Sequence, residues 1–200
     1  MKKAEVRRKQ LLESLADHLL AEGLQSASLR PLAAAAGTSD RMLLHYFADK
    51  EELLTATLNV VTQRLIVLLN SIRADPMPFH SLLPHLAAMI KDVRIQPYLR
   101  LWLELVTFAA GEKEPFRSIA RHIFTTFLNW IASALHVENE QEREPLAALT
   151  LAIVEGLVLF DALGDDSART VALAGVALGF AASQKAVSSS IPNEHHSENT

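Results

Sequence analysis

Side chains suited to contacting nucleic acid are gathered in one short segment, residues 39–50. The guanidinium fork of Arg41 matches the two acceptors on the major-groove edge of guanine, and it binds phosphate equally well. Asp40 could accept a hydrogen bond from cytosine N4, or it could only stabilise a helix N-terminus. Met42 could contact a thymine methyl, and His45 a base or a phosphate. For each of these residues the alternative is an ordinary solvated side chain.

Candidates for phosphate contact lie on both sides of these four residues. Ser39 could cap a helix and contact a phosphate at once, and Lys50 begins a predicted helix whose N-terminus attracts anions. Arg30, in the first turn of another predicted helix, is a further candidate. A basic cluster near the N-terminus consists of Lys2, Lys3, Arg7, Arg8 and Lys9. As an arm, with Lys3 and Arg7 foremost, it could cross the DNA backbone, or it could serve only solubility.

The residue types needed for catalysis or metal binding do not form a template. The chain has no cysteine, which excludes disulfides, thiol nucleophiles and cysteine-ligated metals. His80 and His85 are five residues apart, the wrong spacing for one face of a helix. Glu155 and Asp161 are six apart, which is poor spacing for a paired acid and base. Without a phosphate loop or a serine nucleophile motif, we expect neither an enzyme nor a cofactor or metal.

The elements that must position these side chains are predicted to be helices. Gly and Pro number only 7 and 8 in 200 residues, and the stretches between them are rich in strong helix formers. The apolar periodicity predicts an all-α fold of about nine helices, over residues 4–22, 29–36, 40–46, 50–73, 81–95, 98–110, 115–135, 143–163 and 167–187. Residues 188–200 are expected to be a disordered tail. No run of alternating β-branched residues with tight turns supports β structure.

Capping residues mark where several of these helices begin. Ser28 and Ser39 precede two of them and could each supply a capping hydroxyl. Asp49 and Glu52 have the spacing of a capping box. We expect Gly37 to provide the left-handed turn that ends the helix over 29–36.

The two short helices over 29–36 and 40–46, with the turn between them, form a helix-turn-helix pattern. Leu43 and Phe47 would anchor the second helix to the core. This architecture places the second helix in a DNA major groove. Many helical hairpins share the spacing without binding DNA.

The flanking residues sharpen this interpretation. The residues concerned are Leu11-Leu12, Ala16, Leu19, Gly23, Leu32-Ala33, Ala36-Gly37-Thr38-Ser39, Leu43, His45-Tyr46-Phe47 and Lys50-Glu51-Glu52-Leu53-Leu54. This pattern resembles the TetR family of bacterial transcriptional regulators, as does the step Glu155-Gly156-Leu157. The family usually carries Tyr at position 44 as a phosphate contact. Here Leu44 takes that place, and Tyr46 could supply the contact instead.

The resemblance implies a division of labour along the chain. Residues 1–50 would form the DNA-binding domain, residues 50–73 a connecting helix, and residues 51–187 an effector-binding and dimerisation domain. In the family, the helices after the DNA-binding unit enclose a pocket for a small effector. Large side chains would line it here and suit an apolar or aromatic ligand: Met89, Trp102, Phe124 and Phe127, with Arg100 or Glu104 as polar contacts. The alternative is that this stripe is ordinary core.

The last predicted helix is small and apolar on nearly every face over residues 171–180. Such a helix is more easily buried against a second subunit than within a monomer, and the family dimerises there. The expected interface residues are Glu155, Leu159, Gly175, Leu178 and Gly179. A homodimer would present two helix-turn-helix units to a near-palindromic operator.

The charge of the chain divides unevenly. The formal net charge is -4, but residues 1–50 hold eight Lys and Arg against six Asp and Glu. Overall acidity therefore does not exclude DNA as a partner. No stretch is predicted to span a membrane and no signal peptide is evident, so we expect a cytoplasmic protein. The sequence favours an effector-released repressor; the alternatives are a ligand-independent DNA-binding protein, or a helical small-molecule-binding protein or enzyme with a vestigial helix-turn-helix.

Overall fold

The computed structural model describes residues 3–72, 75–111 and 114–189, with side chains described as far as residue 179. These residues form nine α-helices: α1 (Lys3–Glu22), α2 (Leu29–Ala35), α3 (Asp40–Tyr46), α4 (Lys50–Ile72), α5 (Phe79–Met89), α6 (Gln96–Ala110), α7 (Phe116–Ala134), α8 (Arg143–Ala162) and α9 (Asp166–Ser189). Two short 3-10 helices, η1 (Leu24–Ser26) and η2 (Glu140–Glu142), join them. The predicted all-α class is confirmed. Part of the predicted tail, residues 190–200, lies outside the described residues.

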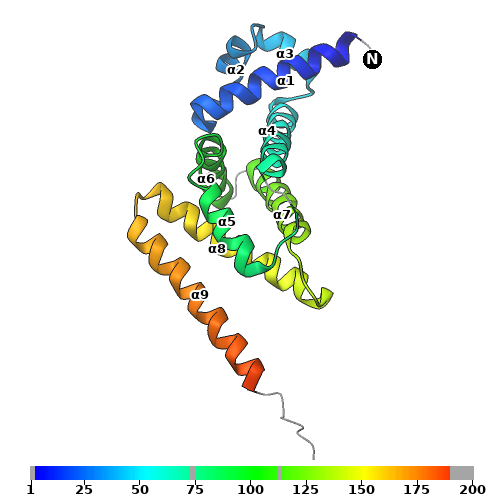
Figure 1. Cartoon of the computed structure of the whole chain (residues 1–200). Coiled ribbons are helices and arrows are strands. Elements are labelled where there is room, and N and C mark those ends of the chain that lie inside the picture. The colour runs from blue at the N-terminus through cyan, green and yellow to red at the C-terminus, as the bar shows by residue number, and fades with distance from the viewer. Residues whose placement is uncertain (1–2, 73–74, 112–113, 190–200) are drawn as a thin grey trace, which may run out of the picture. The chain divides into compact units, whose positions relative to one another are not determined.

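The chain divides into two compact units, which we describe separately. Unit 1 ends at Val158 and unit 2 begins at Leu159, inside α8. Unit 1 therefore contains both the predicted helix-turn-helix and the predicted effector region. Within unit 1, α1, α2 and α3 lie at one end, and α4 and α6 lead away from them towards α5, α7 and the first part of α8 (Figure 1).

A continuous apolar core joins the helix-turn-helix to the rest of unit 1. Leu15 and Leu19 of α1, Leu43 of α3 and Leu58 of α4 are all almost fully buried in it. The same cluster continues to Leu105 of α6. Because these helices share one core, a change in the packing of α4 or α6 also changes the support of α3.

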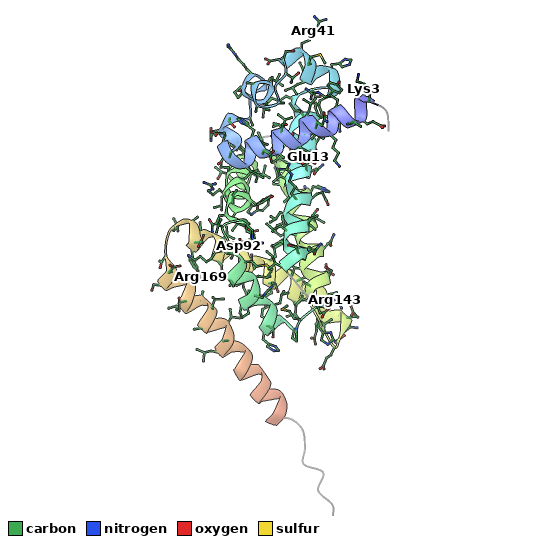
Figure 2. The ribbon with its side chains drawn as sticks, turned by 45° about the horizontal axis from the view of Figure 1, so that its top comes forward. Lys3, Glu13, Arg41, Asp92, Arg143 and Arg169 are labelled. Atoms are coloured by element: carbon green, nitrogen blue, oxygen red, sulfur yellow. The ribbon has the colours of Figure 1, made fainter. Side chains whose placement is uncertain are left out.

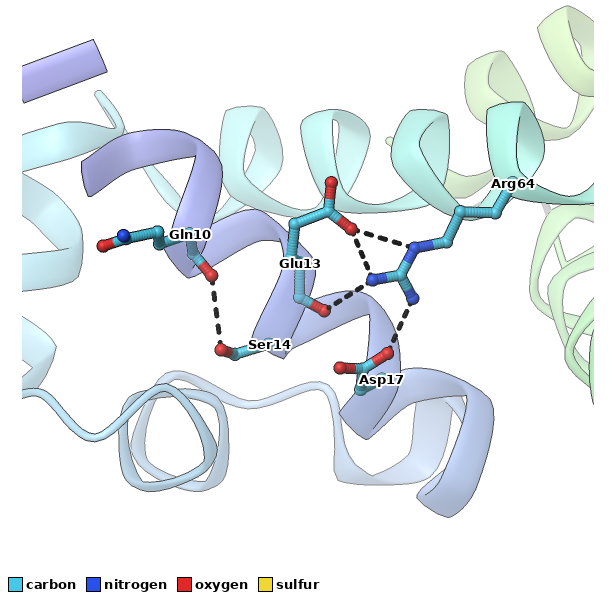
Figure 3. A network of polar contacts seen from close by, with 5 residues as sticks. All are labelled: Gln10, Glu13, Ser14, Asp17 and Arg64. Carbon is cyan, nitrogen blue, oxygen red and sulfur yellow. Dashed lines mark hydrogen bonds and ion pairs between the residues drawn. The ribbon is translucent and has the colours of Figure 1, made fainter. Parts of the chain in front are cut away.

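An arginine on α4 adds polar contacts to this packing. The Arg64 guanidinium donates to the carboxylates of Glu13 and Asp17 on α1, with Nη1 2.7 Å from Asp17 Oδ1 (Figure 3). It also donates to the backbone carbonyl of Glu13 at 3.2 Å. The fork thus spans about one turn of α1 and fixes its register along α4.

The segment between α5 and α6 differs from the prediction. The helix expected over 81–95 begins instead at Phe79 and ends at Met89. Asp92 supplies the physical reason, because its Oδ1 accepts the backbone N–H of Arg94 at 2.9 Å. This local bond competes with the helical backbone pattern, and a helix can start again only at Gln96.

The connection after α7 is held by backbone and side-chain bonds. Met77 forms an isolated β-bridge with Leu135. Arg143 donates to the carbonyls of Ala132 and Leu135 at 2.8 and 2.7 Å. A cation at the end of α7 satisfies carbonyls that have no partner within the helix.

In unit 2, α9 begins with a side-chain cap. Gly164 has a left-handed φ of 70°, and Asp165 Oδ1 accepts from Ala168 N at 2.9 Å. Beyond this first turn, Val171 and Leu178 are 69% and 72% exposed. An apolar helix of this kind lacks cover within its own unit.

Two helical segments, Lys50–Ile72 and Glu140–Ala162, are long and apolar enough to cross a membrane by length and composition. Core helices of soluble proteins meet the same criterion. The first of these segments buries eight residues in unit 1, among them Leu53, Leu54 and Leu58.

Candidate functional site

The turn between α2 and α3 depends on a glycine. Gly37 has a φ of +60°, and Thr38 N donates to Ala33 O at 2.9 Å while Gly37 N donates to Ala34 O at 3.1 Å. These two bonds make a Schellman motif, which satisfies the last carbonyls of α2. The chain therefore leaves α2 abruptly, and α3 begins at Asp40, three residues after Gly37.

The start of α3 is capped by a side chain, whereas the start of α2 is not. Ser39 is extended, and its Oγ accepts from Met42 N at 3.3 Å, as predicted. Ser28 has the same extended conformation before α2, but its hydroxyl makes no capping bond. The predicted side-chain cap at Ser28 is therefore wrong. Helix α2 is anchored instead by the burial of its Leu32 and Ala33 side chains.

Helix α3 carries one buried anchor and an exposed outer face. Leu43 is fully buried. The exposed residues are Asp40, Arg41, Met42, Leu44 and His45. Arg41 projects away from the rest of unit 1 (Figure 2), and no ion-pair partner for it is found in the described part of the chain. An unpaired guanidinium on a capped, anchored helix is available to an external anion.

Arg8 holds the end of α3 in place. Its guanidinium lies 4.6 Å from the ring centroid of Phe47 and pairs with Glu52 at 2.7 Å. It also donates to the carbonyl of Tyr46 at 3.4 Å. Of the predicted N-terminal arm, Arg8 is thus an internal contact, while the neighbouring Lys3 and Arg7 are exposed.

The N-terminus of α4 is built around the predicted capping pair. Asp49 Oδ1 accepts from Glu52 N at 2.8 Å, and Glu52 Oε2 accepts from Ala48 N at 2.6 Å. The backbone N–H of Ala48, followed by the Arg8 guanidinium, lowers the pKa of Glu52 below its ordinary value. Both oxygens of the Glu52 carboxylate are thus engaged, by Ala48 and Arg8. The exposed Lys50 has no ion-pair partner among the described residues.

The remaining predicted DNA contacts have different surroundings. Arg30, in the first turn of α2, is exposed. Tyr46 is half-buried against the core. Its ring meets the ring of His45 edge-on, with the two ring centroids 5.3 Å apart. The structure therefore gives α3 an exposed outer face of polar and apolar side chains, with Tyr46 at its inner edge.

A second feature of unit 1 is an apolar cavity of about 90 Å³ between α4, α5, α6, α7 and α8. Three predicted effector contacts line it: Met89, Trp102 and Phe127. The sequence analysis did not single out Tyr98 and Trp130, which also line it.

The polar contact of this cavity is Glu155. Its Oε2 accepts from the indole N–H of Trp102 at 2.8 Å. Burial raises the pKa of the Glu155 carboxyl above its ordinary value, and the hydrogen bond from Trp102 offsets only part of that rise. Glu155, a predicted dimer-interface residue, lies in the wall of this cavity.

An open groove of about 600 Å³ adjoins the same pair of residues. Trp102 and Glu155 line this groove as well as the cavity, together with the predicted effector residue Phe124 and with Arg121. Trp102 and Glu155 therefore lie between a narrow apolar cavity and a wider, more polar groove.

Two predicted effector contacts, Arg100 and Glu104, line neither space. Arg100 is exposed on α6. Glu104 faces the helix-turn-helix instead, where its Oε2 accepts the backbone N–H of Leu24 at 2.7 Å. A side chain on the neighbouring Gly23 would collide with this carboxylate. Glu104 thus connects α6 to the corner between α1 and α2.

Among the described residues, no group of three or more His, Asp or Glu side chains is placed to hold a metal ion. The expected interface residues Leu159 and Leu178 are exposed in unit 2, and nothing lies within 4 Å of a side chain added at Gly175 or Gly179.

Comparison with known proteins places these features in a family. Residues 11–57 match the family described as bacterial regulatory proteins, tetR family. The chain is 30% identical over 162 residues to the HTH-type transcriptional regulator PksA of Bacillus subtilis, covering 78% of each protein. It is 28% identical over 182 residues to the HTH-type transcriptional regulator BetI of Cronobacter sakazakii, covering 83% of this chain and 87% of that protein.

Solved structures share the fold at lower identity. A TetR-family transcriptional regulator from Cytophaga hutchinsonii superimposes with a TM-score of 0.66 at 16% identity, over 88% of this chain and 93% of that one. A transcriptional regulator from Saccharomonospora viridis, solved in complex with choline, gives a TM-score of 0.56 at 18% identity, over 82% and 88%. At these identities the likeness concerns the fold alone.

Proposed function

This chain belongs to the TetR family of bacterial transcriptional regulators, and from that premise we propose that it is a cytoplasmic repressor released from its operator by a small effector. The relatives are regulators rather than enzymes. The proposal concerns how this chain contacts DNA, how two copies combine, and what releases them.

The observation that carries the proposal is Arg41, exposed and without an ion-pair partner in the described part of the chain, on a helix that Ser39 caps and Leu43 anchors. In a helix-turn-helix, the N-terminal half of the second helix meets base edges in the major groove. Arg41 would contact guanine or phosphate, while Lys50 would contact phosphate beside the α4 N-terminus. The predicted contacts at Asp40, Met42, His45 and Tyr46 would complete this surface.

Arginine and lysine residues outside α3 would add sequence-independent affinity. Arg30, Lys3 and Arg7 are exposed and lie in the first 30 residues. Each phosphate contact made by such a residue adds to the salt dependence of binding without specifying a base.

A second copy of the chain is the proposed partner of unit 2. The exposed apolar residues Leu159, Val171 and Leu178 need cover, and Gly175 and Gly179 leave room for another helix. A two-fold dimer would bring two copies of α3 to successive major grooves, about 34–36 Å apart, and so favour a near-palindromic operator.

The cavity lined by Met89, Trp102 and Phe127 is the proposed effector site. Its apolar lining suits a small, largely apolar ligand. The choline complex of a neighbour with the same fold supports the presence of a small-ligand site in this architecture. Through α4 and α6, an occupied cavity would favour a conformation whose two α3 helices no longer match the operator.

Selection of bound duplexes from a random DNA pool tests this proposal. We expect an enriched inverted repeat with half-site centres about one helical turn apart. Binding to that duplex should weaken as salt is raised, because condensed counterions are released. Enrichment of no sequence, or binding insensitive to salt, would contradict the assignment and favour a protein with a vestigial helix-turn-helix.

A further inference from the structure

The cavity of unit 1 has a single charged group in an otherwise uncharged wall. Aliphatic side chains form most of the lining, and four aromatic rings complete it: Tyr98, Trp102, Phe127 and Trp130. Glu155 is the one acidic or basic residue among the described residues that line it. A carboxylate in such surroundings costs free energy unless a partner compensates it.

Glu155 is only partly compensated by the protein. One of its oxygens accepts from the Trp102 indole at 2.8 Å. Within the described part of the chain, no Lys, Arg or His forms an ion pair with it. Burial accordingly raises the pKa of this carboxyl, and a neutral hydrogen-bond donor offsets only part of the rise. A positive charge placed beside Glu155 would complete the compensation.

The rings around Glu155 favour the same kind of ligand. Aromatic faces attract cations electrostatically, most strongly when both are removed from water, and tryptophan does so best. A buried carboxylate beside aromatic faces therefore discriminates between a cation and a neutral molecule of the same shape. An anion would meet the repulsion of Glu155.

We propose that this cavity binds a small organic monocation with an apolar body, and that Glu155 is its counter-ion. The claim that this cation is the effector rests on the proposed function. The claim that the cavity binds a cation does not. The assignment narrows the effector from apolar molecules in general to amines and quaternary ammonium compounds.

The dimensions of the site limit the ligand. The cavity measures about 90 Å³, less than the roughly 150 Å³ of an engineered cavity that holds benzene. An apolar body of a few carbons therefore fits without rearrangement. Because Glu155 and Trp102 also line the open groove, a longer substituent can extend there. Arg121 in that groove would repel a second positive charge, which disfavours dications.

The experiment compares hexylammonium with hexan-1-ol, two probes of equal length that differ in charge and whose chains can extend from the cavity into the adjoining groove. Both tryptophans of the chain line the cavity, so their fluorescence reports occupancy of the full-length protein without DNA. We expect hexylammonium to bind about tenfold more tightly than the alcohol, the ratio of affinities that corresponds to one charge-assisted bond.

Variants assign this preference to one residue. Glu155→Gln keeps an acceptor oxygen for Trp102 but removes the charge, so the preference for hexylammonium should disappear while the affinity for hexan-1-ol stays the same. Glu144→Gln removes the same charge from an exposed position of α8 and should leave the preference intact.

Three results would overturn the proposal: binding of neither probe, equal binding of both by the unmodified protein, or an unchanged preference in Glu155→Gln. The first two results are measured on the unmodified protein. The proposal can therefore still be refuted if the Glu155→Gln variant does not fold. The test also separates this inference from the proposed function. A chain that prefers hexylammonium through Glu155 but binds no operator would contradict only the regulator assignment.

Discussion

At the residue scale, Gly37 shows how one position orients the DNA-binding surface. Its φ of +60° costs an L-amino acid free energy, although a side chain there would touch nothing within 4 Å. We expect Gly37→Ala to lower the free energy of unfolding by about 1 kcal/mol through backbone strain alone. Urea denaturation measures this, with Gly156→Ala in α8 as the control, since that site is helical and equally open. Equal stability of wild type and Gly37→Ala would contradict the argument.

Asp92 gives a pH dependence at the same scale. The Arg94 side chain, followed by its backbone N–H, lowers the pKa of Asp92 from 3.8 to about 2. Since the folded pKa is the lower one, the stabilisation is present above pH 3.8 and is lost as the pH falls through about 2. Arg94→Ala should move this pKa part of the way back, because the backbone bond remains.

An NMR titration of the Asp92 carboxyl follows this change. The matched control is Arg100→Ala, which removes an exposed arginine that lies outside this turn. An Asp92 pKa that does not change in Arg94→Ala would show that the guanidinium is not its cause.

At the scale of elements, α1 and α4 are held in register by Arg64. Its fork reaches Glu13 and Asp17, which Figure 3 shows on successive turns of α1. We expect Arg64→Ala to destabilise the protein by only about 1 kcal/mol, because solvent partly screens the ion pairs of Arg64 with Glu13 and Asp17. Gln63→Ala, an exposed neighbour on α4, should have almost no effect on the urea midpoint. Equal midpoints for the two variants would show that Arg64 does not hold α1.

Helix α6 connects the cavity with the helix-turn-helix. Its Trp102 lines the cavity, and its Glu104 accepts a hydrogen bond from the backbone N–H of Leu24. Glu104→Ala should accelerate amide hydrogen exchange at Leu24, since that N–H loses its acceptor. Glu22→Ala removes a charge from the exposed end of α1 and serves as the control. Unchanged exchange at Leu24 would contradict this role for Glu104.

The elements also show what sequence could predict. The bounds of α3 follow from neighbours in the chain: the Ser39 cap, the buried Leu43 and the glycine turn before them. The polar contacts of the site do not follow from neighbours in the chain. Glu155 meets Trp102 across 53 residues, and Glu104 meets Leu24 across 80. No local pattern specifies such pairs, so the sequence analysis assigned one to an interface and the other to the cavity.

At the scale of the whole molecule, we expect regulation to require two copies. A charge at Leu178, which is apolar and 72% exposed, should disfavour burial against a partner. Leu178→Asp should therefore shift the protein towards monomers in sedimentation and weaken operator binding. Ser167→Asp adds the same charge in the first turn of α9, outside the apolar stretch, and should leave both unchanged. A stable dimer in Leu178→Asp would contradict the proposed interface.

The central claim is that α3 contacts DNA through Arg41. The direct measurement is the affinity of the unmodified protein, Arg41→Ala and Lys50→Ala for the duplex selected from the random pool, at one fixed salt concentration. Arg41→Ala should weaken binding about 10- to 100-fold and relax the preference at one base pair of each half-site. Lys50→Ala should weaken all sequences alike. Unchanged affinity in the variant that combines both substitutions would contradict the account.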